Sequence, residues 1–213
     1  MPRVKVKICG ITNWPDARCA VEAGADFLGF NFYRPSPRYI SPAKARAIIH
    51  RLPRGIAAVG VFVNEPDESM RKIARTAGLD FLQLHGDEPP ELVAQLRATL
   101  PVIKAVRVRN GFRTAQLVRF RRASAFLLDG FDPRRHGGTG KTFNWEVARR
   151  AGSRRRIFLA GGLTAENVAD AIRVARPYAV DVCSGVESRP GRKDPARISA
   201  LMNAVKSTRR RTR

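Results

Sequence analysis

The chain has 213 residues, of which 44% are hydrophobic and 27% are charged, a composition typical of one well-buried globular domain. No run approaches the roughly 18 apolar residues of a membrane span, and the N-terminal MPRVKVKICG lacks the apolar core of a secretory signal. The three cysteines, Cys9, Cys19 and Cys183, are odd in number and far apart, which argues against a disulfide framework or a zinc site. We therefore expect a cytoplasmic protein with no membrane partner.

The formal net charge is +22, and arginine supplies most of it, with 32 residues against 8 lysines. Such a charge is one signature of a nucleic-acid or other polyanion partner. The arginines are spread along the whole chain, however, and no aromatic residues alternate with them to stack on bases. We expect no specific nucleic-acid partner, and a basic surface that concentrates anionic small molecules.

Short apolar runs alternate with amphipathic segments from one end of the chain to the other. Between the apolar runs, residues such as Ala45, Ile48 and Ile49 recur at the i, i+3, i+4 spacing of a helix that lies on a sheet. The runs themselves predict eight strands: Val4–Cys9, Phe27–Phe32, Ala57–Val63, Phe81–Leu84, Val102–Val108, Ala125–Leu128, Ile157–Ala160 and Ala179–Cys183.

Local signals mark several helix boundaries. Ser41-Pro42 and Asp194-Pro195 each put a capping residue before a proline, which predicts a helix start. Gly24 and Gly78 stand where helices should stop. Three further segments follow the helical period less regularly: Leu92–Leu100, Leu117–Phe120 and Val147–Ala151.

Repeated strand–helix units predict a parallel sheet, because parallel neighbours need a crossover. Eight units averaging about 26 residues suit a compact (β/α)₈ barrel. An open doubly wound sheet usually has fewer strands and a GxGxxG first turn, whereas this turn reads Cys9-Gly10-Ile11-Thr12-Asn13. We predict an α/β fold, a single (β/α)₈ TIM-barrel domain over residues 1–207, followed by a basic, disordered tail over 208–213.

The stretch around Asp129 is a candidate centre for chemistry. Asp129 ends the sixth predicted strand, a glycine-rich mobile loop follows, and a helix is expected to start near Phe143. Gly140-Lys141-Thr142 resembles the end of a nucleotide-binding P-loop, but that motif needs a glycine where Arg135 stands. We therefore predict that Asp129 is a carboxylate at a strand end, covered by a flexible loop.

Cys9 ends the first strand and is the candidate partner of Asp129. A base and an acid on opposite sides of a bound sugar can move a proton between carbons, and the five-strand separation predicts that these two face each other across the barrel mouth. To act as a base, Cys9 needs a helix N-terminus or nearby cations to lower its pKa, and the alternative is a small buried hydrophobe. We interpret Cys19 and Cys183 as small buried hydrophobic residues of this second kind.

Other strand-end residues suit an anionic substrate. Gly161-Gly162 and Ser184-Gly185 follow the last two strands, where barrels commonly bind phosphate through backbone N–H groups; two ordinary tight turns are the alternative. Arg38 lies in a proline-stiffened loop and can bind a carboxylate with two parallel hydrogen bonds. His85 either orients a substrate hydroxyl or caps the fourth strand.

Seven motifs lie in order between residues 7 and 194. They are KICGIT (Lys7–Thr12), SPRYI (Ser36–Ile40), VGVFVN (Val59–Asn64), LQLHGDE (Leu82–Glu88), LLD with GGTGKTFNW, LAGGLTAENV (Leu159–Val168) and VDVCSGVE with PGRKD (Val180–Asp194). Together they resemble phosphoribosylanthranilate isomerase. In this chain Asn144 stands where an aspartate is common in that family, and Cys183 and Arg192 occupy positions that vary.

The resemblance implies an Amadori rearrangement of N-(5-phosphoribosyl)anthranilate to 1-(2-carboxyphenylamino)-1-deoxyribulose 5-phosphate, in tryptophan biosynthesis. It implies Asp129 as the general acid that opens the ribose ring and Cys9 as the general base that takes the C2 proton. It also implies that Arg38 holds the anthranilate carboxylate and that Gly161-Gly162 and Ser184-Gly185 hold the phosphate. No metal or organic cofactor is expected, because the substrate nitrogen acts as the electron sink.

Two alternatives remain at this point. One is a related phosphosugar barrel: an aminoaldose–ketose isomerase of histidine biosynthesis would have an aspartate in place of Cys9, and an indole-glycerol-phosphate synthase would need a lysine–glutamate pair that we do not find. The other is a non-enzymatic polyanion-binding protein, suggested by the charge and the arginine-rich tail. The sequence is compatible with a monomer or a homodimer.

Overall fold

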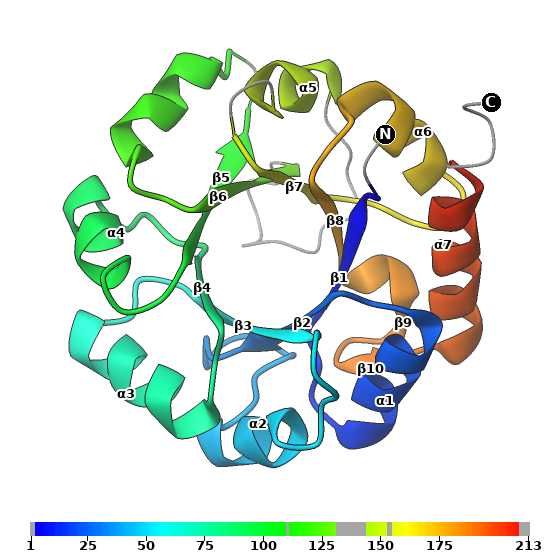
Figure 1. The fold of residues 1–213 in the computed structure, drawn as a ribbon, viewed down its shortest axis with the longest axis horizontal. Coiled ribbons are helices and arrows are strands. Elements are labelled where there is room, and N and C mark those ends of the chain that lie inside the picture. The colour runs from blue at the N-terminus through cyan, green and yellow to red at the C-terminus, as the bar shows by residue number, and fades with distance from the viewer. Residues whose placement is uncertain (1–2, 110, 131–143, 153–154, 209–213) are drawn as a thin grey trace.

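The computed structural model describes residues 3–109, 111–130, 144–152 and 155–208. Eight parallel strands close into a barrel in sequence order, and the helices form a ring around it (Figure 1). This confirms the predicted (β/α)₈ barrel. The barrel strands are β1 (Lys5–Cys9), β2 (Phe27–Asn31), β3 (Ala57–Phe62), β4 (Phe81–Leu84), β5 (Val102–Val108), β6 (Ala125–Gly130), β7 (Ile157–Leu159) and β8 (Ala179–Val182).

The predicted helix boundary signals act as expected. The Ser41 side chain accepts a hydrogen bond from the Lys44 N–H, and the Asp194 side chain accepts from the first turn of its helix. Gly24 and Gly78 end their helices in the left-handed conformation. The helices are α1 (Trp14–Ala23), α2 (Pro42–Ile49), α3 (Asp67–Ala77), α4 (Pro90–Leu96), α5 (Glu146–Gly152), α6 (Val168–Ala175) and α7 (Pro195–Ser207), with 3₁₀ helices η1 (Thr114–Phe120) and η2 (Ser184–Val186).

The structure corrects several predicted boundaries. β8 ends at Val182, because the backbone of Cys183 (φ −122°, ψ −82°) leaves the extended conformation and turns into η2. β6 is longer than predicted and includes Asp129, which pairs with Arg107 of β5. A short hairpin of β9 (Glu187–Arg189) and β10 (Arg192–Lys193) was not predicted.

Some expectations fall on residues 131–143 and 209–213, which lie outside the described residues. They concern the glycine-rich loop with Gly140-Lys141-Thr142, the helix start at Phe143 and nearly all of the basic tail. Among the described residues, α5 begins at Glu146. No helix in the described ranges has both the length and the apolar character needed to cross a bilayer.

The core has two parts, which follow from the alternation of side chains along each strand. Even-numbered residues of β1 and β2, such as Ile8 and Leu28, point outward and pack beneath the helices. A smaller cluster fills the barrel interior, where Phe27 and Phe158 meet edge to face with ring centroids 5.3 Å apart. Polar residues are therefore left to the layers above this cluster, at the carboxyl ends of the strands.

Candidate active site

A pocket with a volume of about 550 Å³ opens at the carboxyl ends of the strands. In the closed barrel only β7 and β8 lie between β6, which carries Asp129, and β1, which carries Cys9. The shorter path around the barrel between these two residues is therefore less than the five strands counted along the sequence. The pocket brings together every site residue predicted from the sequence: Cys9, Arg38, His85, Asp129, Gly161, Gly162, Ser184 and Gly185.

Cys9 lies beside a buried ion pair. Lys7, two residues earlier on β1, is fully buried, and its Nζ donates to both carboxylate oxygens of Asp181 on β8, at 3.0 and 2.9 Å. Against the effect of burial, attraction from Asp181 and Cys9 raises the pKa of Lys7, which keeps its charge. Gly29 on β2 makes room for both side chains, because a Cβ there would lie 2.6 Å from the Cys9 Sγ and 3.0 Å from the Lys7 Nζ.

The environment of Cys9 favours the thiolate. The neighbouring Cys183 thiol and the charge of Lys7 together hold the pKa of Cys9 well below its usual range, despite burial. The proximity of Cys9, together with burial, raises the pKa of Cys183, whose thiol donates to the Glu187 Oε1 at 3.9 Å. The assignment of Cys183 to the core is wrong: it lies just beyond β8 and lines the pocket.

Asp129 and His85 form the opposite part of the pocket. Asp129 is only 5% exposed, and one of its oxygens lies 3.3 Å from the His85 Nε2 without the alignment of a hydrogen bond. The Gln83 amide nitrogen lies 3.0 Å from the His85 Nδ1. With that NH₂ group as the donor, Nδ1 accepts and Nε2 is the nitrogen that bears a hydrogen. A hydrogen-bearing nitrogen and a carboxyl group thus face the same point in the pocket.

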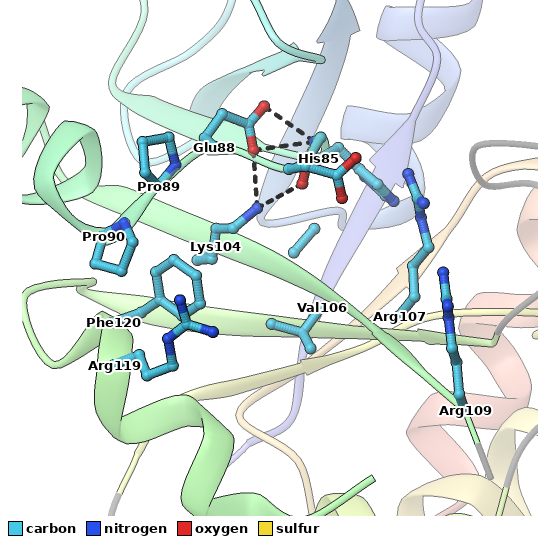
Figure 2. A pocket seen from close by; sticks show the side chains of 13 residues that line it. His85, Glu88, Pro89, Pro90, Lys104, Val106, Arg107, Arg109, Arg119 and Phe120 are labelled. Carbon is cyan, nitrogen blue, oxygen red and sulfur yellow. Dashed lines mark hydrogen bonds and ion pairs between the residues drawn. The ribbon is translucent and has the colours of Figure 1, made fainter. Parts of the chain in front are cut away.

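A second buried ion pair fixes the loop that carries His85. The Lys104 Nζ on β5 donates to Glu88 at 2.8 Å and to the Gly86 carbonyl at 2.8 Å (Figure 2). Glu88 also accepts from the backbone N–H groups of Gly86 and Asn64. Both side chains of the pair are at most 4% exposed. They line a neighbouring cavity of about 370 Å³, which His85 shares with the main pocket. Further basic side chains border this cavity: Arg107, Arg109 and Arg119.

Arg38 reaches the pocket from the loop after β2 and is held by Glu187. Its Nε and Nη2 donate to the two carboxylate oxygens of Glu187 at 2.9 and 2.6 Å, and the Lys193 Nζ donates to the same carboxylate at 3.0 Å. Against the effect of burial, these bonds lower the pKa of Glu187. Among the described residues, none accepts a hydrogen bond from the Arg38 Nη1. That nitrogen remains available to an anion.

The loops after β7 and β8 meet at the pocket rim. Gly161 and Gly162 both have left-handed backbone conformations, with φ of 86° and 63°, and no described residue accepts a hydrogen bond from either N–H. Gly185 packs against this loop so closely that a Cβ would lie 2.0 Å from the Leu163 carbonyl oxygen. Asn167 closes the β7 loop by donating to the Gly162 carbonyl at 2.8 Å. Unpaired N–H groups in such a turn are suited to an anion.

Sequence reasoning missed the residues that set the charge of the site. KICGIT and VDVCSGVE contain Lys7 and Asp181, but the alternation along each strand was not used to place both inside the barrel. Glu187 and Lys193 belong to the unpredicted hairpin. Over the described part of the chain, no group of three or more His, Cys, Asp and Glu side chains is placed to hold a metal ion.

Comparisons with known proteins agree with this geometry. The model of a family described as N-(5'phosphoribosyl)anthranilate (PRA) isomerase matches residues 6–204. The N-(5'-phosphoribosyl)anthranilate isomerase of Pelobacter propionicus is 51% identical over 206 residues, which cover 97% of each chain. The crystal structure of phosphoribosyl anthranilate isomerase from Thermotoga maritima is 46% identical, covers 96% of this chain and 99% of that one, and superposes with a TM-score of 0.90.

A further crystal structure shows phosphoribosyl anthranilate isomerase in complex with reduced 1-(o-carboxyphenylamino)-1-deoxyribulose 5-phosphate. It is 44% identical, covers 96% of this chain and 99% of that one, and has a TM-score of 0.86. That ligand carries a carboxylate at one end and a phosphate at the other.

Proposed function

Because this chain belongs to the N-(5'-phosphoribosyl)anthranilate isomerase family, we propose that it rearranges its substrate with Cys9 as the general base and Asp129 as the general acid. The chain is an isomerase of tryptophan biosynthesis. Its reaction converts an aminoaldose into an aminoketose, which requires a proton at the ribose ring oxygen and the loss of a proton from C2. The related phosphosugar barrels of histidine and indole synthesis are not supported by these relatives.

Asp129 suits the first step. Its buried carboxyl group protonates the ring oxygen, the ring opens, and the substrate nitrogen forms a Schiff base with C1. The His85 Nε2 lies 3.3 Å from this carboxyl group and acts as a hydrogen-bond donor to the oxygen that is released. Between the two roles that the sequence left open for His85, its place in the pocket favours orienting the substrate.

Cys9 suits the second step. As a thiolate it removes the C2 proton, the electrons move through C1 to the Schiff-base nitrogen, and the resulting enolamine tautomerises to the ketone. The observation that carries the proposal is the placement of a thiolate-favouring Cys9 and a buried Asp129 in one pocket. The charge of Lys7 stabilises the thiolate before the proton is transferred.

The two anionic ends of the substrate differ in their partners. Arg38 is the only Lys or Arg among the described residues that line the pocket, and its Nη1 suits the anthranilate carboxylate. The phosphate is then bound without a lysine or arginine, by the N–H groups of Gly161-Gly162 and of Ser184-Gly185 at the start of η2. Both assignments use the residues expected from the sequence, but the two parallel hydrogen bonds of Arg38 go to Glu187, and only Nη1 is left for the substrate.

The test is the turnover of freshly generated phosphoribosylanthranilate, followed by the loss of its fluorescence. Cys9→Ala and Asp129→Asn should each lower kcat by about 10²-fold or more, the usual contribution of a general base or acid. Cys19→Ser, a change on α1 outside the pocket, is the matched control and should keep the wild-type rate. Wild-type kcat in Cys9→Ala would remove Cys9 from the mechanism.

A further inference from the structure

Beyond the isomerase reaction, the active site contains two thiols that the strand register places side by side. The last pairs between β1 and β8 are Lys7 with Asp181 and Ile8 with Val182, so the next residues along are Cys9 and Cys183. Paired positions on neighbouring strands lie about 4.8 Å apart. This separation falls within the range of about 4.4 to 6.8 Å between the Cα atoms of a disulfide.

The two side chains also share a face. The bond between Lys7 and Asp181 shows that both point into the barrel, and the side chain of Cys9, two residues after Lys7 on β1, returns to the same side. A Cβ added to Gly10 would lie 3.1 Å from the Cys183 Sγ, which places that sulfur against the residue after Cys9. Both cysteines are free, partly exposed and in the wall of the pocket, so a small solute can reach them.

We propose that Cys9 and Cys183 are a peroxide-reactive pair that closes to a reversible disulfide across the mouth of β1 and β8. In the first step the Cys9 sulfur attacks one oxygen of the peroxide, the O–O bond breaks, and Cys9 becomes a sulfenic acid while hydroxide leaves. In the second step the Cys183 sulfur attacks the Cys9 sulfur, the S–O bond breaks, and the S–S bond forms. The hydroxide and the proton of Cys183 leave as water, so two thiols and one peroxide give one disulfide and two waters.

The surroundings suit both steps. The lowered pKa of Cys9 makes it the nucleophile that peroxide oxidises first, since the thiolate is the reactive form. The Lys193 Nζ lies 4.0 Å from the Cys183 Sγ and stabilises the thiolate that forms as Cys183 attacks. Cys19 has neither feature: it lies on α1, and burial raises its pKa.

The test treats the full chain with hydrogen peroxide, removes the excess with catalase, and measures intact mass, disulfide-linked peptides and turnover. The wild type and Cys19→Ser should lose two hydrogen atoms, yield a linked Cys9–Cys183 peptide, and fall in activity by about 10²-fold or more because the base is blocked. Dithiothreitol should restore both mass and activity. In Cys183→Ser, measured against its own untreated rate, Cys9 should gain oxygen and yield no linked peptide. Once its mass shows the two added oxygens of a sulfinic acid, activity should stay lost after dithiothreitol.

The proposal is overturned if the wild type gains only oxygen at Cys9, or if both thiols survive a peroxide dose that oxidises Cys9 in Cys183→Ser. The mass measurement does not depend on the role of Cys9 in catalysis. A linked peptide with unchanged turnover would support the disulfide while removing Cys9 as the base, so the two proposals fail separately.

Discussion

Gly161 is the position where one added methyl group should disturb the proposed acid without replacing any proposed catalytic side chain. Its backbone has φ of 86°, and a Cβ would lie 2.4 Å from the Gly130 nitrogen and 2.8 Å from the Asp129 Oδ1. The absence of a side chain therefore lets the β7 loop, which we assign to phosphate, close onto the end of β6. Gly161→Ala should push the β7 loop and the end of β6 apart.

The size of the effect follows from these contacts. Moving the Gly130 nitrogen from 2.4 Å to an ordinary contact of 3.4 Å displaces the end of β6 by about 1 Å, and a misplacement of that size costs about 10²-fold in rate. The left-handed conformation adds about 1–2 kcal/mol of strain for any residue with a Cβ. We expect kcat to fall by about 10²-fold and the free energy of unfolding to fall by more than the strain alone.

Gly55→Ala is the matched control, because Gly55 has φ of 95° and a Cβ there would meet nothing within 4 Å. Its free energy of unfolding in urea should fall by the same strain energy, and its turnover should equal that of the wild type. Equal losses of stability in both variants, with wild-type kcat in Gly161→Ala, would refute the claim that Gly161 holds Asp129 in place.

Two other changes test the charges of the site. Lys7→Met should raise the pKa of the Cys9 thiol, because it removes the cation that favours the thiolate. The midpoint of the pH profile of iodoacetamide alkylation should then move to higher pH. Lys5→Met, at the other end of β1, is the control and should leave that midpoint unchanged. Arg38→Met should raise KM by about 10- to 100-fold with little change in kcat, since a hydrogen bond to a charged group contributes about 1.5–3 kcal/mol. A substrate analogue without the carboxylate should not distinguish Arg38→Met from the wild type, and a selective loss with that analogue would contradict the assignment.

The fold was predictable because strand runs, helical spacing and capping residues all indicate the same repeating unit, and the side chains at the strand ends then fall on one rim. The error at Cys183 arose from a single residue: as a strand member it was assigned to the core, but β8 ends at Val182 and Cys183 lines the pocket together with Cys9. Lys7 and Asp181 are separated by 174 positions, so their ion pair depends on the closure of β1 against β8. Local patterns predicted the closed barrel but not the register that sets Lys7 beside Asp181.

The net charge of +22 describes the molecule as a whole and not its pocket. Among the described residues near Cys9, Lys7 is paired with Asp181, and Lys193 shares Glu187 with Arg38. A basic surface can speed the arrival of an anionic substrate. Once the substrate is bound, however, the forces on it come from a few fixed donors, and the charge that lowers the pKa of Cys9 is largely balanced within the protein. The sequence therefore indicates an anionic ligand through its total charge, while the chemistry depends on pairs that appear only when the barrel closes.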